Sequence, residues 1–425
     1  MNKKKISVVG LGYIGLPTAA VIASHSYTVL GVDNNPDVVK TINRGELHIV
    51  EPNLAEVVRE SVSLGNLKAA LNPEPADVFI IAVPTPFNID EEDGLTPNLD
   101  FVMSAIDSIA PVLKSGNLII LESTSPVGTT ENLSKRLSKK RPDLSFPTSS
   151  KSTSDISIAY CPERVLPGNI INELVQNDRI IGGLSEQCSK KACEIYKIFV
   201  TGECHITNAR TAELTKLTEN SCRDVQIAFA NEMSLICDEL NIDVWELIDL
   251  ANRHPRINIL QPGPGVGGHC IAVDPWFIVN SAPSQTKLIR QARIVNDSKP
   301  LWVIDKVKST IADILFENPS MDQAQIKIVF FGLTFKPDID DLRESPSLKI
   351  VRDISKQHLG KVVAVEPNIE SLDEEDFKLQ DIDKACDGAS IGVLLVDHKE
   401  FREMSPPAIS KIIDTKGIWN RKKLS

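Results

Sequence analysis

A glycine-rich turn between two short apolar runs constrains the first part of this chain more than any other feature. The runs are Ile6–Val9 and Tyr27–Val32, the turn reads GLGYIG at residues 10–15, and Asp33 follows the second run. In a strand–turn–helix–strand unit such glycines admit a pyrophosphate, and an acid about 20 residues further on binds the ribose hydroxyls. A bare GxGxxG can be only a structural turn, but a strand on each side favours a dinucleotide site. Asp33 favours NAD over NADP, because its carboxylate would repel a 2′-phosphate.

Two later apolar runs end in polar turns that carry candidate hydroxyl groups. Strands are predicted at Val78–Val83 and Leu118–Leu121, and the turns that follow contain Thr85, Thr124 and Thr130. Ligands of a doubly wound sheet lie beyond the carboxyl ends of its strands, so these hydroxyls are candidate cofactor contacts. Ordinary turn or helix-cap hydroxyls are the alternative.

A third polar turn follows the predicted strand Ile156–Tyr160. It reads CPERVLPG and places Glu163 and Arg164 just past the strand end. A site at the sheet edge and a solvated acid–base pair are both compatible with this segment.

Residues 207–252 are predicted to form a long helix, with apolar residues such as Leu217 at helical spacing. Lys216, Asn220 and Arg223 fall on one face of that helix. The two cations would suit a diphosphate, and Lys216 could act as an acid or base; a solvated polar face is the alternative. A helix of this length could pack against its copy, so we expect a dimer.

The segment Pro262–Phe277 reads PGPGVGGHCIAVDPWF and surrounds Cys270 with glycines, His269 and Asp274. Glycines let backbone approach a ligand closely, and a thiolate attacks carbonyl carbon readily. Cys270 is therefore a candidate nucleophile, and a buried structural cysteine is the alternative.

The last third of the chain echoes the first. Strands are predicted at Ile326–Phe331, Lys361–Val365 and Ile391–Val396, with a possible fourth at Ile409–Asp414. The segment VVAVEPN is similar to TVLGVDNNP but lacks a full glycine fingerprint, which favours a nucleotide rather than a dinucleotide. A helix over 287–316, broken at Pro300, precedes these strands.

We therefore predict an α/β fold with two Rossmann-like doubly wound domains joined by a long central helical segment. The predicted boundaries are 1–205 for the NAD-binding domain, 206–300 for the helical dimerisation segment with the cysteine loop, and 301–425 for the C-terminal domain. At 425 residues the chain is too long for one typical core.

Charge and cysteine usage narrow the range of partners. The net charge of −11 argues against a nucleic-acid or acidic-membrane partner. Eight cysteines without a CxxC argue against a zinc site and favour thiols in a reducing cytoplasm. The basic start and first apolar run imitate a signal peptide, but Pro17 and the glycines interrupt the run, and no segment approaches the ~20 apolar residues of a membrane span. We expect a cytoplasmic protein with no metal, nucleic-acid or membrane partner.

Six motifs, in order along almost the whole chain, resemble the UDP-glucose/GDP-mannose 6-dehydrogenase family. They are GLGYIG, STSPVGTT, CPERVLPG, AELTKLTEN, GVGGHCIAVDP and FGLTFKPDIDDLRESP. Within the family, IAVPTPF, HPRINIL and PGPGVGGHCIAVDPWF are most similar to members that act on UDP-N-acetyl-D-mannosamine. Glucose members typically have Ser where this chain has His269 and Lys where it has Val273, which weighs against glucose.

The resemblance implies a four-electron oxidation of carbon 6 of a UDP-sugar, with two NAD. Cys270 matches the family's nucleophile, which forms a thiohemiacetal and then a thioester that water hydrolyses. Lys216 would stabilise oxyanions or move protons, and Asp274 would orient Lys216 and the water. Glu163, with Thr124 nearby, matches the acid of thioester hydrolysis.

The resemblance also implies two sets of binding residues. The substrate set is Arg164, Val165, Lys216, Asn220, Arg223, His254, Arg256, Gly267, Lys336 and Arg343, with Lys336 facing the diphosphate and Arg256 reaching across a dimer. The cofactor set is Gly10, Gly12, Tyr13, Ile14, Gly15, Asp33, Thr85, Thr130 and Arg343.

Two alternatives stay open. The first is the same reaction on UDP-N-acetylglucosamine or UDP-glucose. The second is a non-catalytic nucleotide-binding protein on the same fold. The second would predict loss of Cys270, Lys216 or Glu163, and all three are present.

Overall fold

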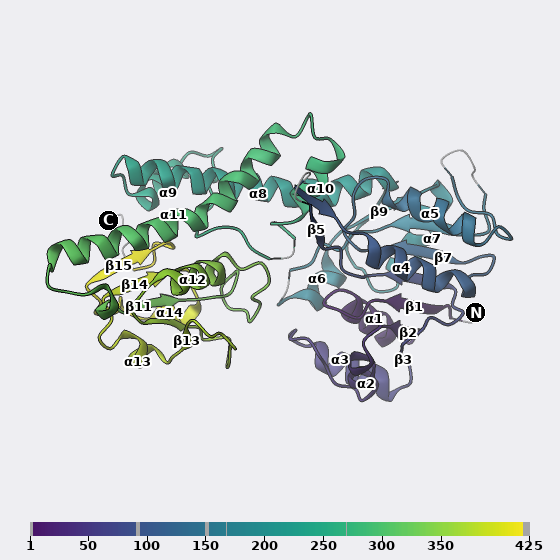
Figure 1. The fold of residues 1–425 in the computed structure, drawn as a ribbon. Helices are drawn as coiled ribbons and strands as arrows, with labels where there is room; N and C mark the ends of the chain where they lie inside the picture. Colours follow the sequence, from purple (N-terminus) through teal and green to yellow (C-terminus); the bar gives the residue numbers. More distant parts are fainter. Residues whose placement is uncertain (1–2, 91–93, 149–152, 167, 269, 420–425) are drawn as a thin grey trace. The chain divides into compact units, whose positions relative to one another are not determined.

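The computed structural model describes residues 3–90, 94–148, 153–166, 168–268 and 270–419. Contacts divide the chain into two compact units, Met1–Glu219 with Trp276–Ala282 and Asn220–Pro275 with Pro283–Ser425. Each unit contains a sheet of largely parallel strands flanked by helices (Figure 1). The α/β fold class with two Rossmann-like domains is confirmed, whereas the three domain boundaries given above stay a prediction.

The first unit is built on an eight-stranded sheet in the order β10-β9-β8-β7-β4-β1-β2-β3. Neighbouring strands pair parallel, except that β8 and β9 are antiparallel. The strands are β1 (Lys5–Val9), β2 (Thr28–Val32), β3 (Leu67–Ala70), β4 (Val78–Ile81), β7 (Leu118–Leu121), β8 (Ser157–Tyr160), β9 (Arg179–Gly183) and β10 (Cys204–Asn208). A separate antiparallel hairpin joins β5 (Phe87–Asp90) and β6 (Gly94–Pro97).

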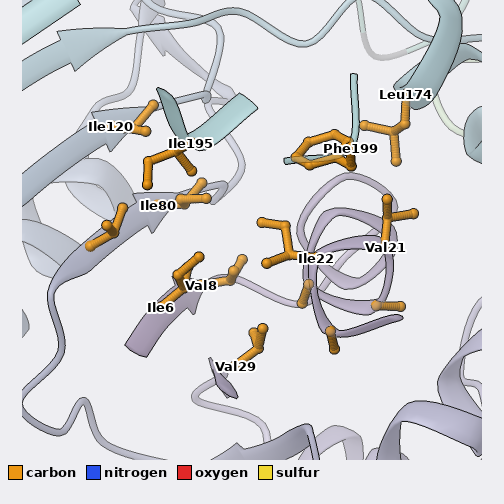
Figure 2. Packing of buried hydrophobic residues seen from close by; sticks show 14 of the residues in the cluster. Ile6, Val8, Val21, Ile22, Val29, Ile80, Ile120, Leu174, Ile195 and Phe199 are labelled. Carbon is orange, nitrogen blue, oxygen red and sulfur yellow. The ribbon is translucent and has the colours of Figure 1, made fainter. Parts of the chain in front are cut away.

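Alternate residues along these strands feed two separate cores. Ile6 and Val8 of β1 lie in one core and Val9 in the other, as the two-residue period of a strand requires. Figure 2 shows the first core, where Val21 and Ile22 of a helix pack over the strands. That core is covered by α1 (Gly15–Ser24), α2 (Pro36–Asn43), α3 (Leu54–Ser63), α6 (Ile170–Gln176) and α7 (Glu186–Tyr196), and the second by α4 (Asp100–Ile109) and α5 (Thr129–Lys140).

The second unit has a five-stranded parallel sheet in the order β13-β12-β11-β14-β15. Its strands are β11 (Ile328–Phe331), β12 (Val362–Val365), β13 (Lys378–Leu379), β14 (Ile391–Leu394) and β15 (Lys411–Asp414). Residues of α11 (Lys287–Glu317) and α12 (Pro346–Gln357) fill one core, and residues of α13 (Ile382–Cys386) and α14 (Lys399–Glu403) fill the other.

The helical predictions need two corrections. The helix predicted over 207–252 is two helices, α8 (Ala209–Glu239) and α9 (Val244–Ala251). Between them Asn241 adopts a φ of 54°, a left-handed conformation that ends α8. The Asp243 side chain then caps the N-terminus of α9 and starts the second helix. Conversely, α11 is not broken at Pro300: the proline lies inside it and is buried. Packing of Val303 and the later turns against the sheet outweighs the one lost hydrogen bond.

Several strands were not predicted from the sequence. β3, β9 and β10 have small, charged or polar residues among their apolar ones, and the hairpin carries Asn88 and Thr96. The conformation of β3, β9 and β10 depends on pairing with strands far away in the chain, which local patterns do not report.

A buried carboxylate fixes the start of α8 to the sheet edge. Glu213 is fully buried and accepts hydrogen bonds from Gly128 N (2.6 Å), Thr130 N (2.8 Å) and Thr130 Oγ1 (2.6 Å). The two amides belong to the N-terminal end of α5, whose N–H groups lack partners within the helix. Burial raises the pKa of Glu213, and these three donors oppose that shift.

We predict that Glu213→Ala lowers the free energy of unfolding by about 3 kcal/mol or more, because three buried donors lose their acceptor. Glu131→Ala is the matched control. Glu131 pairs with Arg210 at 3.1 Å, and Arg210 is 60% exposed, so its loss costs less than about 1 kcal/mol. Urea denaturation of both variants checks the difference, and equal losses would contradict the anchoring role of Glu213.

Candidate functional site

The three glycines of the first turn, residues 10–15, have different structural roles. Gly10 adopts a φ of 92°, and a Cβ there would lie 2.5 Å from the carbonyl oxygen of Ala82. A Cβ on Gly15 would overlap the carbonyl oxygen of Gly10. Gly12 is exposed, and its Cβ would meet no protein atom within 4 Å. Gly10 and Gly15 therefore make the turn possible, while Gly12 keeps space open above it.

Asp33 is joined to the same turn. It accepts N–H groups from Leu11 at 3.0 Å and from Asn35 at 2.9 Å, one on each carboxylate oxygen. Each oxygen retains a second lone pair for a hydroxyl group. Tyr13 and Ile14 are half-buried at the start of α1, so this edge of the sheet has the open turn, the helix N-terminus and the acid that a dinucleotide needs.

The predicted threonines have different surroundings. Thr85 is buried and Thr124 is half-buried in the turns after β4 and β7. Ser123 donates to Val83 O at 2.7 Å and so holds these two turns together. Thr130 is fully buried, and its hydroxyl donates a hydrogen bond to Glu213. In this structure that hydroxyl proton is therefore used in a contact within the protein.

Glu163 and Arg164 do not form a solvated pair. Glu163 is 7% exposed and forms an ion pair of 2.6 Å with Arg179, which is itself buried. The Arg164 guanidinium pairs with Glu219 at 2.8 Å, and only its backbone N–H reaches Glu163. Arg179 was not among the predicted site residues, because the strand that it begins, β9, was not predicted. The available signal was a charged residue at the start of the apolar run RIIGG.

In the second unit, the glycine loop before Cys270 is pressed against the segment that carries Lys336 and Arg343. The N–H of Gly268 donates to Arg343 O at 3.3 Å. A Cβ on Gly267 would overlap the carbonyl oxygen of Glu344, and Gly268, with a φ of 83°, lies against the Phe335 ring. These glycines are required by close packing between the two predicted substrate segments.

Cys270 is exposed, four residues before the start of α10 (Asp274–Ser281). Its carbonyl oxygen accepts the N–H of Asp274 at 2.8 Å. Asp274 is 2% exposed and accepts from Asn220 at 2.5 Å. Asn220 lies one helical turn from Lys216 on α8. His269 lies outside the described residues.

The remaining predicted substrate residues are mostly on the surface of their own units. Arg223, His254, Arg256 and Arg343 are exposed, whereas Val165 and Lys336 are half-buried. The N–H of Arg256 donates to His254 Nδ1 at 3.4 Å. Arg343 pairs with Asp341 at 2.6 Å.

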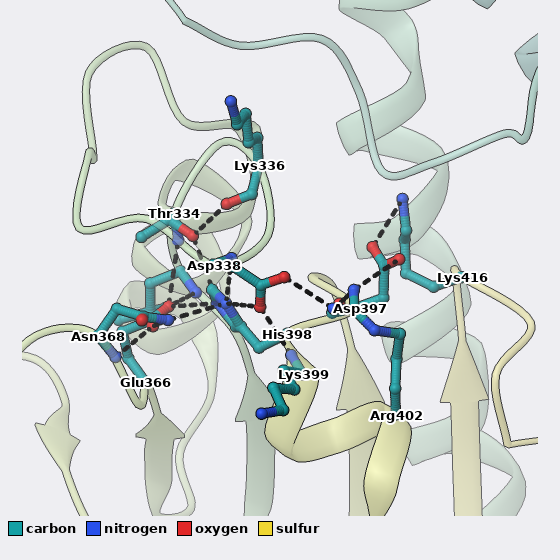
Figure 3. Close-up of polar contacts among 11 residues, drawn as sticks. Thr334, Lys336, Asp338, Glu366, Asn368, Asp397, His398, Lys399, Arg402 and Lys416 are labelled. Carbon is teal, nitrogen blue, oxygen red and sulfur yellow. Dashed lines mark hydrogen bonds and ion pairs between the residues drawn. The ribbon is translucent and has the colours of Figure 1, made fainter. Parts of the chain in front are cut away.

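The turn after β11 repeats the geometry of the first turn. Gly332 adopts a φ of 89°, and Leu333 N donates to Glu366 at 2.7 Å, as Leu11 N donates to Asp33. Figure 3 shows what differs: the buried His398 ring points at Glu366, with Nε2 3.1 Å from its carboxylate. Although burial acts to raise the pKa of Glu366, hydrogen bonds from His398, Leu333 and Asn368 lower it.

Neither a metal cluster nor a membrane span is found in the part of the chain that the structure describes. No three described His, Cys, Asp or Glu residues are grouped to hold an ion. No described helix has the length and apolar character to cross a bilayer.

Sequence models of three domains match the chain in order. They are the NAD binding domain of the UDP-glucose/GDP-mannose dehydrogenase family at 4–200, its central domain at 210–298 and its UDP binding domain at 329–421. The chain belongs to this family. This match confirms the resemblance seen in the motifs. It also confirms the predictions that the chain is an enzyme of this class, that its cofactor is NAD and that it has a UDP-sugar-binding domain.

Full-length relatives and a solved structure agree with this assignment. A UDP-N-acetyl-D-mannosamine dehydrogenase from Yersinia pestis is 58% identical over 99% of this chain and 100% of its own. An NDP-N-acetyl-D-galactosaminuronic acid dehydrogenase from Ralstonia nicotianae is 55% identical over 99% of this chain and 98% of its own. The structure of the UDP-N-acetyl-mannosamine dehydrogenase Cap5O from Staphylococcus aureus is 43% identical, covers 98% of this chain and 96% of its own, and has a TM-score of 0.84.

We predict opposite effects of alanine at two glycines of the first turn. Gly15→Ala should lower the free energy of unfolding by about 3 kcal/mol, because its Cβ would overlap backbone. Gly12→Ala should change stability by less than about 1 kcal/mol but weaken NAD binding at least tenfold, because its Cβ enters the open space. Thermal unfolding and calorimetric NAD titration check both, and unchanged NAD affinity in Gly12→Ala would contradict this placement of the cofactor.

Proposed function

We propose that the chain is an NAD-dependent UDP-N-acetyl-D-mannosamine 6-dehydrogenase, which converts the C6 alcohol to the carboxylate of UDP-N-acetyl-D-mannosaminuronate. The observation that carries the proposal is the full-length 58% identity to the Yersinia relative. The loop PGPGVGGHCIAVDPWF supports it, since His269 and Val273 stand where glucose members typically have Ser and Lys.

Cys270 is the proposed nucleophile. Its exposure at the end of a glycine loop suits attack on a carbonyl carbon. The C6 alcohol is first oxidised to the aldehyde, with loss of one hydride and one proton, and the thiolate adds to the aldehyde carbon. Loss of a second hydride from the thiohemiacetal gives a thioester, and water releases the uronate while the thiolate leaves. Only a thiol combines strong addition with easy departure.

Four further residues are proposed to assist. Lys216 stabilises the oxyanion or moves its proton. Asp274 orients Lys216 and the water, and its bond to Asn220 fixes the carboxylate for that task. Glu163 takes the proton of the attacking water, with Thr124 nearby.

The proposed substrate residues are those that match the family's motifs. They are Arg164, Val165, Lys216, Asn220, Arg223, His254, Arg256, Gly267, Lys336 and Arg343. Lys336 is assigned to the diphosphate, because a lysine serves phosphate as a compact positive charge.

The residues proposed to hold NAD are those of the first turn and its neighbours. They are Gly10, Gly12, Tyr13, Ile14, Gly15, Asp33, Thr85, Thr130 and Arg343. When bound there, NAD accepts the hydride of each oxidation. The open space at Gly12 and the carboxylate of Asp33 fit its pyrophosphate and ribose.

We also propose a homodimer or higher homo-oligomer. Phe229, Ile236 and Leu240 lie at seven- and four-residue intervals and are 51%, 41% and 59% exposed. This spacing puts them on one side of the C-terminal half of α8 and its end, where a second copy would cover them. We place the enzyme in the cytoplasm, where its nucleophilic thiol stays reduced.

A nucleotide-sugar panel tests the substrate. We expect UDP-N-acetyl-D-mannosamine to give the highest kcat/KM, with two NADH for each uronate, above UDP-N-acetylglucosamine, UDP-N-acetylgalactosamine and UDP-glucose. A preference for the galactosamine sugar would instead align the chain with the Ralstonia relative. Absence of NADH formation with every sugar would favour the non-catalytic alternative.

We predict that Cys270→Ser loses steady-state turnover by several orders of magnitude, because an alkoxide is a poor leaving group where a thiolate leaves readily. NAD and UDP-sugar affinity should persist. Intact-protein mass spectrometry should reveal any trapped adduct, and Cys222→Ser, at another exposed cysteine, is the control. Normal uronate release by Cys270→Ser would overturn the thioester mechanism.

A further inference from the structure

Four buried side chains form a charged cluster beneath the polar edge of the first sheet. Glu122, directly after β7, is 2% exposed, and Arg179 at the start of β9 is equally buried. Arg179 donates from Nη1 to Glu163 at 2.6 Å, and its guanidinium lies 5.1 Å from the centre of the Tyr196 ring. Tyr196, the last residue of α7, donates its hydroxyl to Glu122 Oε1 at 2.6 Å. The cluster thus joins three strand ends and one helix.

The charges of this cluster do not balance if both acids are ionised. Two carboxylates, Glu122 and Glu163, face one guanidinium, and the remaining ionisable neighbours, Tyr196 and Cys161, are neutral when protonated. Removing two like charges from water with one counter-ion is unfavourable, so such a pair retains a proton.

The hydrogen bonds indicate which acid retains that proton. Glu163 has a donor on each oxygen, the Arg179 guanidinium and the N–H of Arg164. Glu122 receives only the Tyr196 hydroxyl on Oε1, and its buried Oε2 has no hydrogen-bond partner among the described residues. Donors favour the ionised form of an acid, so Glu163 is the better carboxylate and Glu122 the better carboxylic acid.

We propose that Glu122 is a positioning residue for thioester hydrolysis: it retains the proton of the Glu122–Glu163 pair and leaves Arg179 to hold Glu163 ionised. The inference rests on the role proposed above for Glu163. Glu163 then meets the attacking water as a carboxylate and can take one proton from it, as the water oxygen bonds to the thioester carbon and the Cys270 thiolate departs.

The raised pKa of Glu122 agrees with a protonated Glu122 beside an ionised Glu163. Burial and the charge of Glu163 raise its pKa to about 7, against the opposing effects of Arg179 and the Tyr196 hydroxyl. A raised pKa in the folded state means that the stabilising effect of protonated Glu122 is complete below its ordinary pKa of 4.5 and is lost as pH rises through about 7. Above that pH a second negative charge competes for Arg179.

Infrared spectroscopy of the full chain tests the proton directly, without reference to activity. The native protein should show the C=O band of a protonated carboxyl that disappears as pH rises through about 7, and Glu122→Gln should lack it. Tyr196→Phe should move the midpoint upward, since a donor to the carboxylate is lost, and Glu163→Gln should move it downward, since a negative charge is lost. Persistence of the same band in Glu122→Gln would overturn the proposal, and Tyr196→Phe keeps it testable should Glu122→Gln not fold.

Kinetics test the link to the reaction. Glu122→Gln should lose the inflection near neutral pH in the kcat profile, at unchanged KM for NAD and UDP-sugar, and Glu122→Asp should restore a titrating step. Glu131→Gln, at a half-buried residue that pairs with Arg210 outside the cluster, is the control and should retain the native profile. A lost infrared band with a native kcat profile in Glu122→Gln would overturn the positioning role. Normal uronate release by Glu163→Gln would overturn the proposed role of Glu163 and this inference with it, whatever the infrared result.

Discussion

In each of the two sheets, one carboxylate accepts the backbone N–H of the residue that follows a turn glycine. This hydrogen bond organises the polar edge of the sheet. Asp33 binds Leu11 N in the first sheet and Glu366 binds Leu333 N in the second. In each, the first strand leads into a left-handed glycine, and the acid ends the neighbouring parallel strand. Since parallel strands end at one edge, this bond fixes the turn at the place where ligands of such sheets bind.

The second sheet uses the same bond for a different purpose. The buried His398 ring lies against Glu366, and its Nδ1 accepts from the backbone of Asp338 and from Asn368 (Figure 3). Glu366 is held by a histidine and by three backbone N–H groups, those of Leu333, Thr334 and Asn368. Asp33 accepts one backbone N–H on each oxygen, which leaves each oxygen a further lone pair. The same bond therefore belongs to a network of donors around Glu366, whereas Asp33 retains capacity to accept further hydrogen bonds.

Sequence reasoning succeeded where the determining contacts are local. GLGYIG and Asp33 lie within one strand–turn–helix–strand unit, and the predicted strand Leu118–Leu121 agrees with the structure. It failed where the partner lies elsewhere in the fold. Antiparallel pairing of β8 with β9 brings Arg179 to Glu163, and the contact between the starts of α5 and α8 brings Glu213 to Thr130. No local pattern shows either contact. Leu214 and Phe229 share the helical spacing of core residues but are exposed in the single chain, because spacing identifies a face of a helix and not what covers it.

The position of the cysteine loop also depends on residues that are distant in the chain. Gly263 N donates to Asn231 of α8, Asn231 donates to Asn296 of α11, and Asn296 in turn binds Asp224. Asp224 is also paired with the buried Arg293 at 2.7 Å. A buried network of this kind is stable only when each charge keeps its partner. The glycines therefore give the loop its shape, while residues of two long helices decide where that shape is held, and the reactivity expected of Cys270 depends on both.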